Sequence, residues 1–171
     1  MKLFLFDFHR MLNDENLPYP DTMHPVVVHF VIGMVFFAYF CDIFGYLNNN
    51  HRIFEVSWWN LLVASFAVFV AVIFGEFEAS LAEPYGTAKN VLDWHTINGW
   101  SISAVLVAIT AWRGIIRIKN PLKIPVPYLG VMTVFMCMVC LQIYLGDLID
   151  WVYGLHSVSV VKATREGLFL K

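Results

Sequence analysis

Hydrophobic and polar positions alternate along this chain in long blocks. Four blocks of mostly apolar residues are separated by short polar stretches, and roughly 20 apolar residues are enough for one helix to cross the hydrocarbon core of a bilayer. Short connections and an even number of helices favour an antiparallel bundle. The pattern therefore predicts four transmembrane helices, over residues 25–47, 57–77, 94–112 and 126–147.

The composition agrees with an all-α integral membrane protein. Of the 171 residues, 59% are hydrophobic and only 14% are charged, and the mean hydropathy is +0.66. The formal net charge of −2 gives no reason to expect a nucleic acid partner. We expect a short interfacial N-terminal segment (1–23), an antiparallel four-helix membrane bundle (24–156) and an exposed C-terminal tail (157–171).

Basic residues in the short connections predict the orientation, because cytoplasmic loops carry an excess of lysine and arginine. The connection after the second helix holds only Lys89. The connections after the first and third helices should therefore be cytoplasmic, which places both termini in the periplasm of a prokaryotic inner membrane. Their basic residues are Arg52, Arg113, Arg117, Lys119 and Lys123.

Four of the six histidines lie at helix ends that an antiparallel bundle brings to the outer surface. His24 and His29 open the first helix, His95 opens the third, and His156 follows the fourth. Five residues separate His24 and His29 by about 140° around a helix. Both can face one site only if His24 precedes the helix proper, and Pro25 favours this. Ionisable groups at membrane depth are costly and usually functional, so we expect a site here.

Imidazoles on facing helices suit a b-type haem, because haem iron takes axial histidines and the ring fits between the helices of a bundle. We interpret His29 and His95 as the best axial pair, since each lies within about one turn of a predicted helix start. His24 and His156 would form a second pair or lie beside the ring, so that the bundle holds one haem or two. Small residues at a similar depth would give the ring room: Gly33, Gly75 and Gly99.

The acidic residues fall into two groups. Asp42 lies in the cytoplasmic half of the first helix and suits a buried ion pair, with Arg113 as one candidate partner, or a proton path. The others share the histidine layer, where a carboxylate can orient a ligating imidazole; for Glu78 and Asp150 we expect simple solvation. This outer group consists of Glu76, Glu78, Asp93, Asp147 and Asp150.

These features predict a small b-type cytochrome that passes electrons near the outer membrane face. It would be a subunit of a respiratory or photosynthetic electron-transfer complex, and the other subunits would be its partners. A periplasmic cytochrome c or a quinone would be a further partner. The haem would supply the chemistry, since we find no nucleophile–base signature and no phosphate-binding glycine loop. The sequence contains no C-x-x-C-H, which excludes covalent c-type haem.

Two alternatives remain open. Histidines with a carboxylate also suit a zinc, copper or iron ion. In the other alternative there is no cofactor, and the histidines hydrogen-bond a partner subunit, a quinone head group or a lipid. The protein would then be a structural or assembly subunit of a membrane complex.

Several short motifs resemble a family of four-helix membrane proteins known as domain of unknown function 2231. That family opens with H-P-x-x-V-H-F-P, carries an aspartate late in the first helix, a glycine late in the second and a histidine opening the third, and ends after the fourth helix with a Gly-Gly…Val-Tyr-x-His-Gly motif. The matching positions here are His24, Pro25, Val28, His29, Phe30, Asp42, Gly75, His95, Gly146, Val152, Tyr153 and His156.

The resemblance covers roughly residues 23–160 and implies a four-helix membrane fold without implying an activity. The chain departs from the pattern at Val31, Asp147 and Ser157, and one extra residue separates Tyr153 from His156. The four histidines that the topology brings together are the ones that the family's motifs contain.

Overall fold

The computed structural model describes residues 23–81 and 84–168, and the regular structure of these residues is entirely helical. Four of the helices are long and apolar enough to cross a membrane, which confirms the predicted all-α membrane fold. The interfacial segment expected before residue 23 lies outside the described residues. In chain order the elements are α2 (Met23–Leu47), α3 (His51–Leu81), α4 (Gly86–Lys119), α5 (Val126–Asp147), the short π-helix η1 (Leu148–Val152) and α6 (Val158–Arg165).

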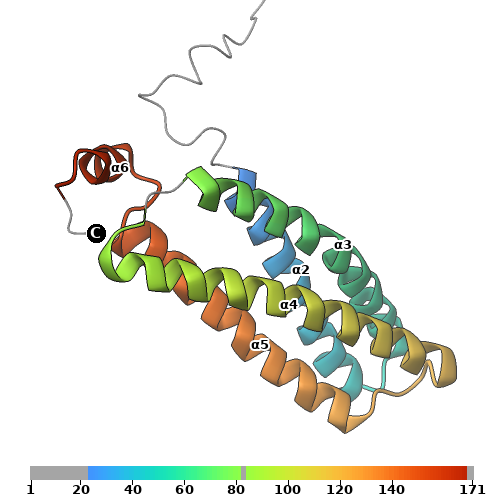
Figure 1. Ribbon diagram of the computed structural model, residues 1–171. Helices are drawn as coiled ribbons and strands as arrows, with labels where there is room; N and C mark the ends of the chain where they lie inside the picture. Colours follow the sequence, from blue (N-terminus) through green and yellow to red (C-terminus); the bar gives the residue numbers. More distant parts are fainter. Residues whose placement is uncertain (1–22, 82–83, 169–171) are drawn as a thin grey trace, which may run out of the picture.

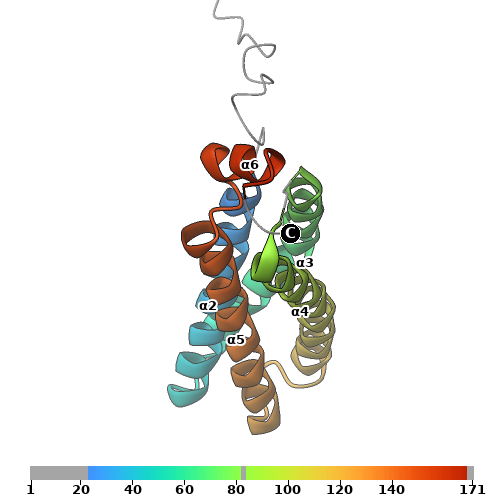
Figure 2. The same cartoon turned by 60° about the vertical axis from the view of Figure 1, so that its left-hand side comes forward.

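The four long helices form one bundle, and the start of each lies against the end of the one before it (Figure 1, Figure 2). The backbone N–H of His24, at the start of α2, donates to Glu78 near the end of α3 over 3.2 Å. The rings of Trp112, late in α4, and Tyr128, early in α5, lie 5.5 Å apart. Successive helices therefore bring the starts of α2 and α4 to the same end of the bundle.

Two helices, α3 and α4, are much longer than the apolar blocks that predicted them, whereas α5 spans the predicted residues 126–147. α3 begins at His51 instead of Ser57, and α4 begins at Gly86 instead of Trp94. With 34 residues, α4 is about 51 Å long, against roughly 30 Å for the hydrocarbon core of a bilayer. Its polar ends therefore extend beyond the hydrocarbon, where their side chains remain solvated, and this is why they resemble loops in the sequence.

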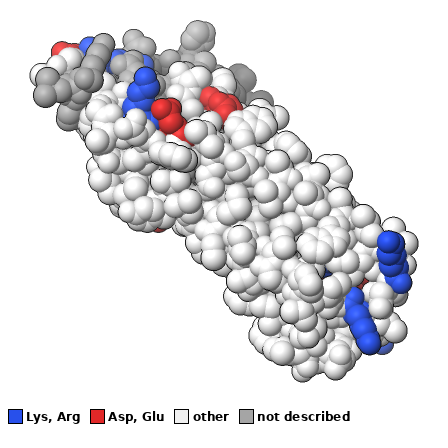
Figure 3. Space-filling view, turned by 60° about the horizontal axis from the view of Figure 1, so that its bottom comes forward, with Lys and Arg blue, Asp and Glu red and all other residues white. Residues whose placement is uncertain are grey.

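Each long helix buries one stripe of side chains and leaves its other faces to the lipid. In α2 the buried stripe includes Val31, Val35 and Ala38, at spacings of three or four residues. Large apolar side chains cover the outer faces, and on the face drawn in Figure 3 charged side chains concentrate at the two ends of the molecule. This surface is the reverse of a soluble protein's and fits a bilayer environment.

A buried polar cluster, here called the polar clasp, joins all four long helices at the end opposite the starts of α2 and α4. Asp42 of α2 and Arg113 of α4 form an ion pair at 3.5 Å, with 0% and 2% of the side chains exposed. The Tyr128 hydroxyl of α5 donates to the other oxygen of Asp42 over 3.0 Å. Arg113 also donates to the carbonyl of Phe54 in α3 over 3.1 Å. The buried ion pair expected for Asp42 is thus formed with Arg113.

The clasp is also packed against aromatic faces. The Arg113 guanidinium lies 5.6 Å from the ring centre of Phe54 and 6.0 Å from that of Tyr128. A desolvated guanidinium is attracted to such rings. Because Arg113 is buried inside α4, it must be removed from the loop cations that the orientation argument counted.

The C-terminal tail (157–171), predicted as exposed, contains a short helix, and most of its described residues are exposed. Gly154 has φ +58° and reverses the chain after η1, a conformation that glycine adopts without a steric penalty. The chain then forms α6, in which Val161 and Thr164 are buried. Figure 2 shows α6 at the end of the bundle where α2 begins.

Loss of the Asp42 carboxylate should destabilise the bundle strongly. Asp42→Ala leaves Arg113 buried without its counter-ion, and breaking a buried pair in this way costs about 3–5 kcal/mol. We expect that decrease in the free energy of unfolding, measured by denaturant titration in detergent micelles.

Glu55→Ala is the matched control, since Glu55 forms a bidentate ion pair with Arg117 at 2.7 and 2.8 Å but both side chains are partly exposed. An exposed pair contributes little to stability, so this variant should unfold like the parent. Equal effects of the two substitutions would contradict the role of the clasp.

Candidate functional site

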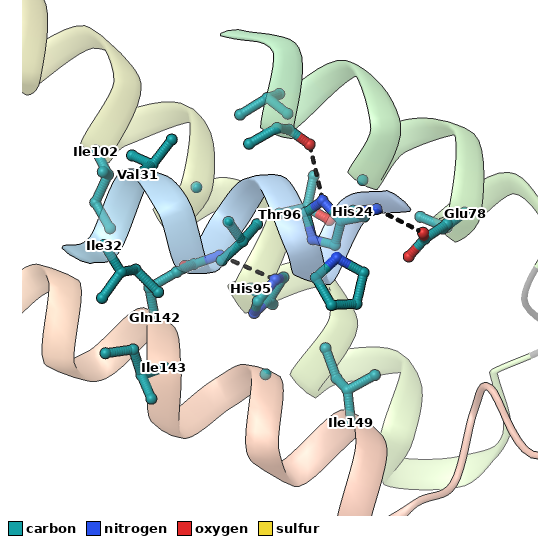
Figure 4. A pocket seen from close by; sticks show the side chains of 18 of the residues that line it. His24, Val31, Ile32, Glu78, His95, Thr96, Ile102, Gln142, Ile143 and Ile149 are labelled. Carbon is teal, nitrogen blue, oxygen red and sulfur yellow. Dashed lines mark hydrogen bonds between the residues drawn. The ribbon is translucent and has the colours of Figure 1, made fainter. Parts of the chain in front are cut away.

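A cavity of about 210 Å³ lies inside the bundle at the end where α2 and α4 begin (Figure 4). The part of the cavity nearest that end is polar and is lined by all four of the histidines that the sequence singled out. The part toward the middle of the bundle is apolar and extends to Val35, Leu106 and Val139. From His95 to Leu106 is eleven residues of one helix, so the cavity runs about 16 Å along the bundle. The four histidines that line it are His24, His29, His95 and His156.

His24 is fixed by two hydrogen bonds to α3. Its Nδ1–H donates to the carbonyl of Ala71 over 2.8 Å, and its backbone N–H donates to Glu78 over 3.2 Å. Because a carbonyl only accepts, Nδ1 carries the proton of the neutral ring, and Nε2 is left with a free lone pair. The ring packs onto Gly75, where a Cβ would lie 2.8 Å from the imidazole.

Glu78 is buried, with 4% of its surface exposed, so the expected solvation of this carboxylate is wrong. The first N–H groups of a helix have no partner within the helix, and a carboxylate that accepts one of them is also stabilised by the helix dipole. Glu78 caps the start of α2 in this way, by accepting the hydrogen bond from the backbone N–H of His24. A sequence pattern within one helix does not reveal a cap supplied by another.

His95 belongs to a chain of amide hydrogen bonds between α4 and α5. The Asn98 amide donates to the carbonyl of Met138 over 3.2 Å and to Gln142 Oε1 over 2.9 Å. This orients the Gln142 amide so that its N–H₂ donates to His95 Nε2 over 3.0 Å. His95 therefore carries its proton on Nδ1, an atom that is buried and has no hydrogen-bond partner among the described residues.

His156 reaches the cavity because η1 and the turn at Gly154 bring the chain back to the bundle. Its Nε2 lies 3.6 Å from the Asp150 carboxylate, and its Nδ1 is buried without a partner among the described residues. The extra residue before His156, relative to the family pattern, lies within this turn. It therefore does not prevent His156 from lining the cavity.

His29 differs from the other three. It is exposed, and its Nδ1–H donates to the carbonyl of Pro25 in its own helix over 2.6 Å. His24, His95 and His156 line the cavity with side chains that are partly buried. These three, here called the histidine trio, form a different set from the His29 and His95 pair that the sequence favoured.

The glycines expected to face a haem ring have other neighbours. Gly75 is covered by the His24 ring, and Gly99 faces the side-chain amide of Gln142 at 3.2 Å from its Cβ position. No described atom lies within 4 Å of the Cβ position at Gly33. Two of the three glycines thus make room for the hydrogen-bonded side chains of the cavity itself.

The mouth of the cavity is acidic. Glu76, which accepts a 2.7 Å hydrogen bond from the Trp100 indole, lines it together with Asp147 and Asp150. No lysine or arginine is among the described residues that line the cavity. The mouth therefore favours a cationic or neutral ligand over an anionic one.

The site fits a haem only in part, because the acidic mouth does not favour the two propionates that a haem carries. Imidazole nitrogen is the right donor, and His24 Nε2 is free to bind. His95 would have to exchange its Gln142 partner for iron. Within residues 23–81 and 84–168 no group of three or more His, Cys, Asp or Glu side chains is arranged to hold a metal ion.

Comparison with known families is decisive for classification. A family model described as "Predicted membrane protein (DUF2231)" matches residues 20–159. This chain belongs to that family. No curated protein and no solved structure matches it. Membership of DUF2231 confirms the resemblance seen in the sequence motifs and assigns a membrane protein.

Two functional residues escaped the sequence reading. Gln142 and Asn98 fix the proton position of His95. Gln142 is a single polar residue within an apolar stretch, and Asn98 is one of several polar residues near the start of the predicted helix. A signal was available, since uncharged polar groups at membrane depth usually hydrogen-bond across helices. Only the packing of α4 against α5 identifies which groups they meet.

Gly75→Ala should displace His24. The added methyl group would meet the imidazole at 2.8 Å, and overpacking of this kind costs about 1–3 kcal/mol. We expect a lower free energy of unfolding in detergent. Gly33→Ala is the control, because no described atom lies within 4 Å of its Cβ position, and it should be neutral. A neutral Gly75→Ala would show that His24 does not occupy this position.

Proposed function

We propose that this DUF2231 protein is an electron-transfer subunit of a membrane complex and that its redox group lies in the histidine cavity. The observation that carries the proposal is the gathering of four imidazoles around one cavity at one end of four apolar helices. Such groups at membrane depth are retained mainly for function. The apolar walls below them suit a ligand that enters from the bilayer.

The first candidate for the redox group is the b-type haem expected from the sequence. Bound there, it would supply one-electron transfer. His24 would hold the iron through Nε2, with His95 as the second ligand in place of its bond to Gln142. Ala71 supports His24 in this role, because a backbone carbonyl that accepts the Nδ1 proton fixes the ring and raises its basicity as a ligand.

The partners follow from the position of the cavity. Its mouth opens among carboxylates at the end of the bundle proposed to face the periplasm, where a basic periplasmic cytochrome c would be attracted electrostatically. The exposed apolar helix faces suit either lipid or the other subunits of a complex. We place the protein in a prokaryotic inner membrane with both termini periplasmic.

A cofactor-free structural or assembly subunit is the second candidate, and one observation favours it. His24 and His95 are each hydrogen-bonded to a neighbouring helix, to Ala71 and to Gln142. Such bonds stabilise helix association in a membrane by about 0.6 kcal/mol each. The same histidines could therefore serve packing alone.

An absorption spectrum separates the two candidates. Full-length protein purified in mild detergent from cells supplied with haem precursor should show a dithionite-reducible b-type spectrum. His24→Ala and His95→Ala should each lose most of the bound haem, because each removes a ligand.

His51→Ala is the control, since His51 is exposed at the start of α3, at the other end of the bundle. This variant should keep its haem. A colourless parent protein that still assembles with its partner subunits would support the structural candidate and exclude the haem.

The orientation can be tested with reporter fusions. Without Arg113, four basic residues remain in or beside the two connections proposed to be cytoplasmic, against Lys89 alone in the connection after the second long apolar helix. Alkaline phosphatase should therefore be active when fused after Lys171 and inactive when fused after Asn120. The reverse pattern would place the histidine cavity at the cytoplasmic surface. The four residues are Arg52, Arg117, Lys119 and Lys123.

A further inference from the structure

The cavity presents a hydrogen-bond acceptor on one side. His24 Nδ1–H is committed to the carbonyl of Ala71, so the neutral ring has only the lone pair of Nε2 to offer. Rotation of the ring would break that bond and move the imidazole away from Gly75, against which it is packed. A ligand that meets His24 must therefore donate a proton to it.

The opposite side presents a donor. The bond from Asn98 to the carbonyl of Met138 fixes the Asn98 amide, which in turn fixes the Gln142 amide. His95 Nε2 accepts from Gln142, so Nδ1 carries the proton and has no partner among the described residues. An unsatisfied buried donor is costly, and a ligand that accepts this proton removes the cost.

Both imidazoles line the same cavity. Figure 4 shows them projecting from α2 and α4, with Ile32, Ile102 and Ile143 to one side of them. Toward the middle of the bundle the walls continue as aliphatic side chains for about 16 Å. The site therefore suits a molecule with a small polar head and an apolar chain.

The head must also be uncharged or cationic. Three carboxylates line the mouth, and no lysine or arginine does so among the described lining residues. An anionic head, such as that of a fatty acid or an acidic phospholipid, would be repelled. This leaves neutral heads that carry both a donor and an acceptor.

We infer that the histidine cavity binds a prenylated hydroquinone, with one ring hydroxyl donating to His24 Nε2 and the other accepting from His95 Nδ1. The inference rests on the redox role proposed for the cavity but replaces the haem as its occupant, because both ligands would use His24 and His95. The prenyl chain fills the apolar part that ends at Leu106 and Val139. The reduced carrier is preferred because a quinone carbonyl opposite His24 would place two acceptors together.

Paired titrations test this preference. Decylubiquinol and decylubiquinone, titrated anaerobically into the detergent-purified full-length protein, should differ in affinity by about tenfold in favour of the quinol. His24→Ala removes the acceptor and should reduce that ratio to about one. Equal binding of the two redox forms by the parent protein would overturn the inference.

A second pair of variants tests the apolar part and does not depend on how well a histidine variant folds. Val139→Phe adds bulk inside the cavity and should weaken both decyl compounds at least tenfold. Val134→Phe is on the same helix, but its side chain is 65% exposed, and it should bind both normally. Normal binding by Val139→Phe would place the chain elsewhere and overturn the inference.

Two further arms identify the ligand class and separate this inference from the haem proposal. Decylbenzene has the chain without the hydroxyls, and binding as tight as that of the quinol would mean that the cavity holds any apolar chain, which overturns the inference. If the purified protein contains haem and binds no quinol, the quinol inference is overturned, but the proposed electron-transfer function is kept. If the protein is colourless and shows the expected preference for the quinol, the quinol inference is supported and the haem proposal is excluded.

Discussion

The ion pair between Asp42 and Arg113 is the interaction on which the rest of the bundle depends. Two charges within membrane-spanning helices are stable only when each is satisfied by the other and by further hydrogen bonds. Tyr128 and the Phe54 carbonyl supply these bonds from the two remaining helices. One polar cluster therefore fixes the relative positions of all four helices at one end, and the opposite end is free to enclose a cavity instead of a dense core.

The two ends of the bundle thus use polar groups in different ways. In the polar clasp most of the hydrogen-bonding groups have partners within the protein, as a structural cluster requires. In the cavity His24 and His95 are each held through one ring nitrogen, and the buried Nδ1 atoms of His95 and His156 have no partner among the described residues. That contrast, more than the number of histidines, distinguishes a binding site from a packing device. It also explains why His29, bonded to its own helix, is the least informative of the four.

The sequence predicted the fold well because a bilayer imposes a minimum length on every spanning helix. It underestimated α3 and α4, since helical turns outside the hydrocarbon have the composition of loops. It also predicted that four histidines share one end of the bundle, and all four line the cavity there. It could not predict which of them interact, because that depends on side-chain rotation. Nor could it predict the positions of protons, which Gln142 and Ala71 set through contacts 47 residues away along the chain.

The length of α4 has a consequence for how this protein meets its neighbours. A helix of about 51 Å in a hydrocarbon layer of roughly 30 Å leaves some 20 Å to be shared between the two aqueous borders. Its first turns, from Gly86 to Leu92, lie beside the cavity entrance. A water-soluble protein can bind these turns without entering the lipid. Because the same helix also lines the cavity, the docking surface and the cavity belong to one rigid element.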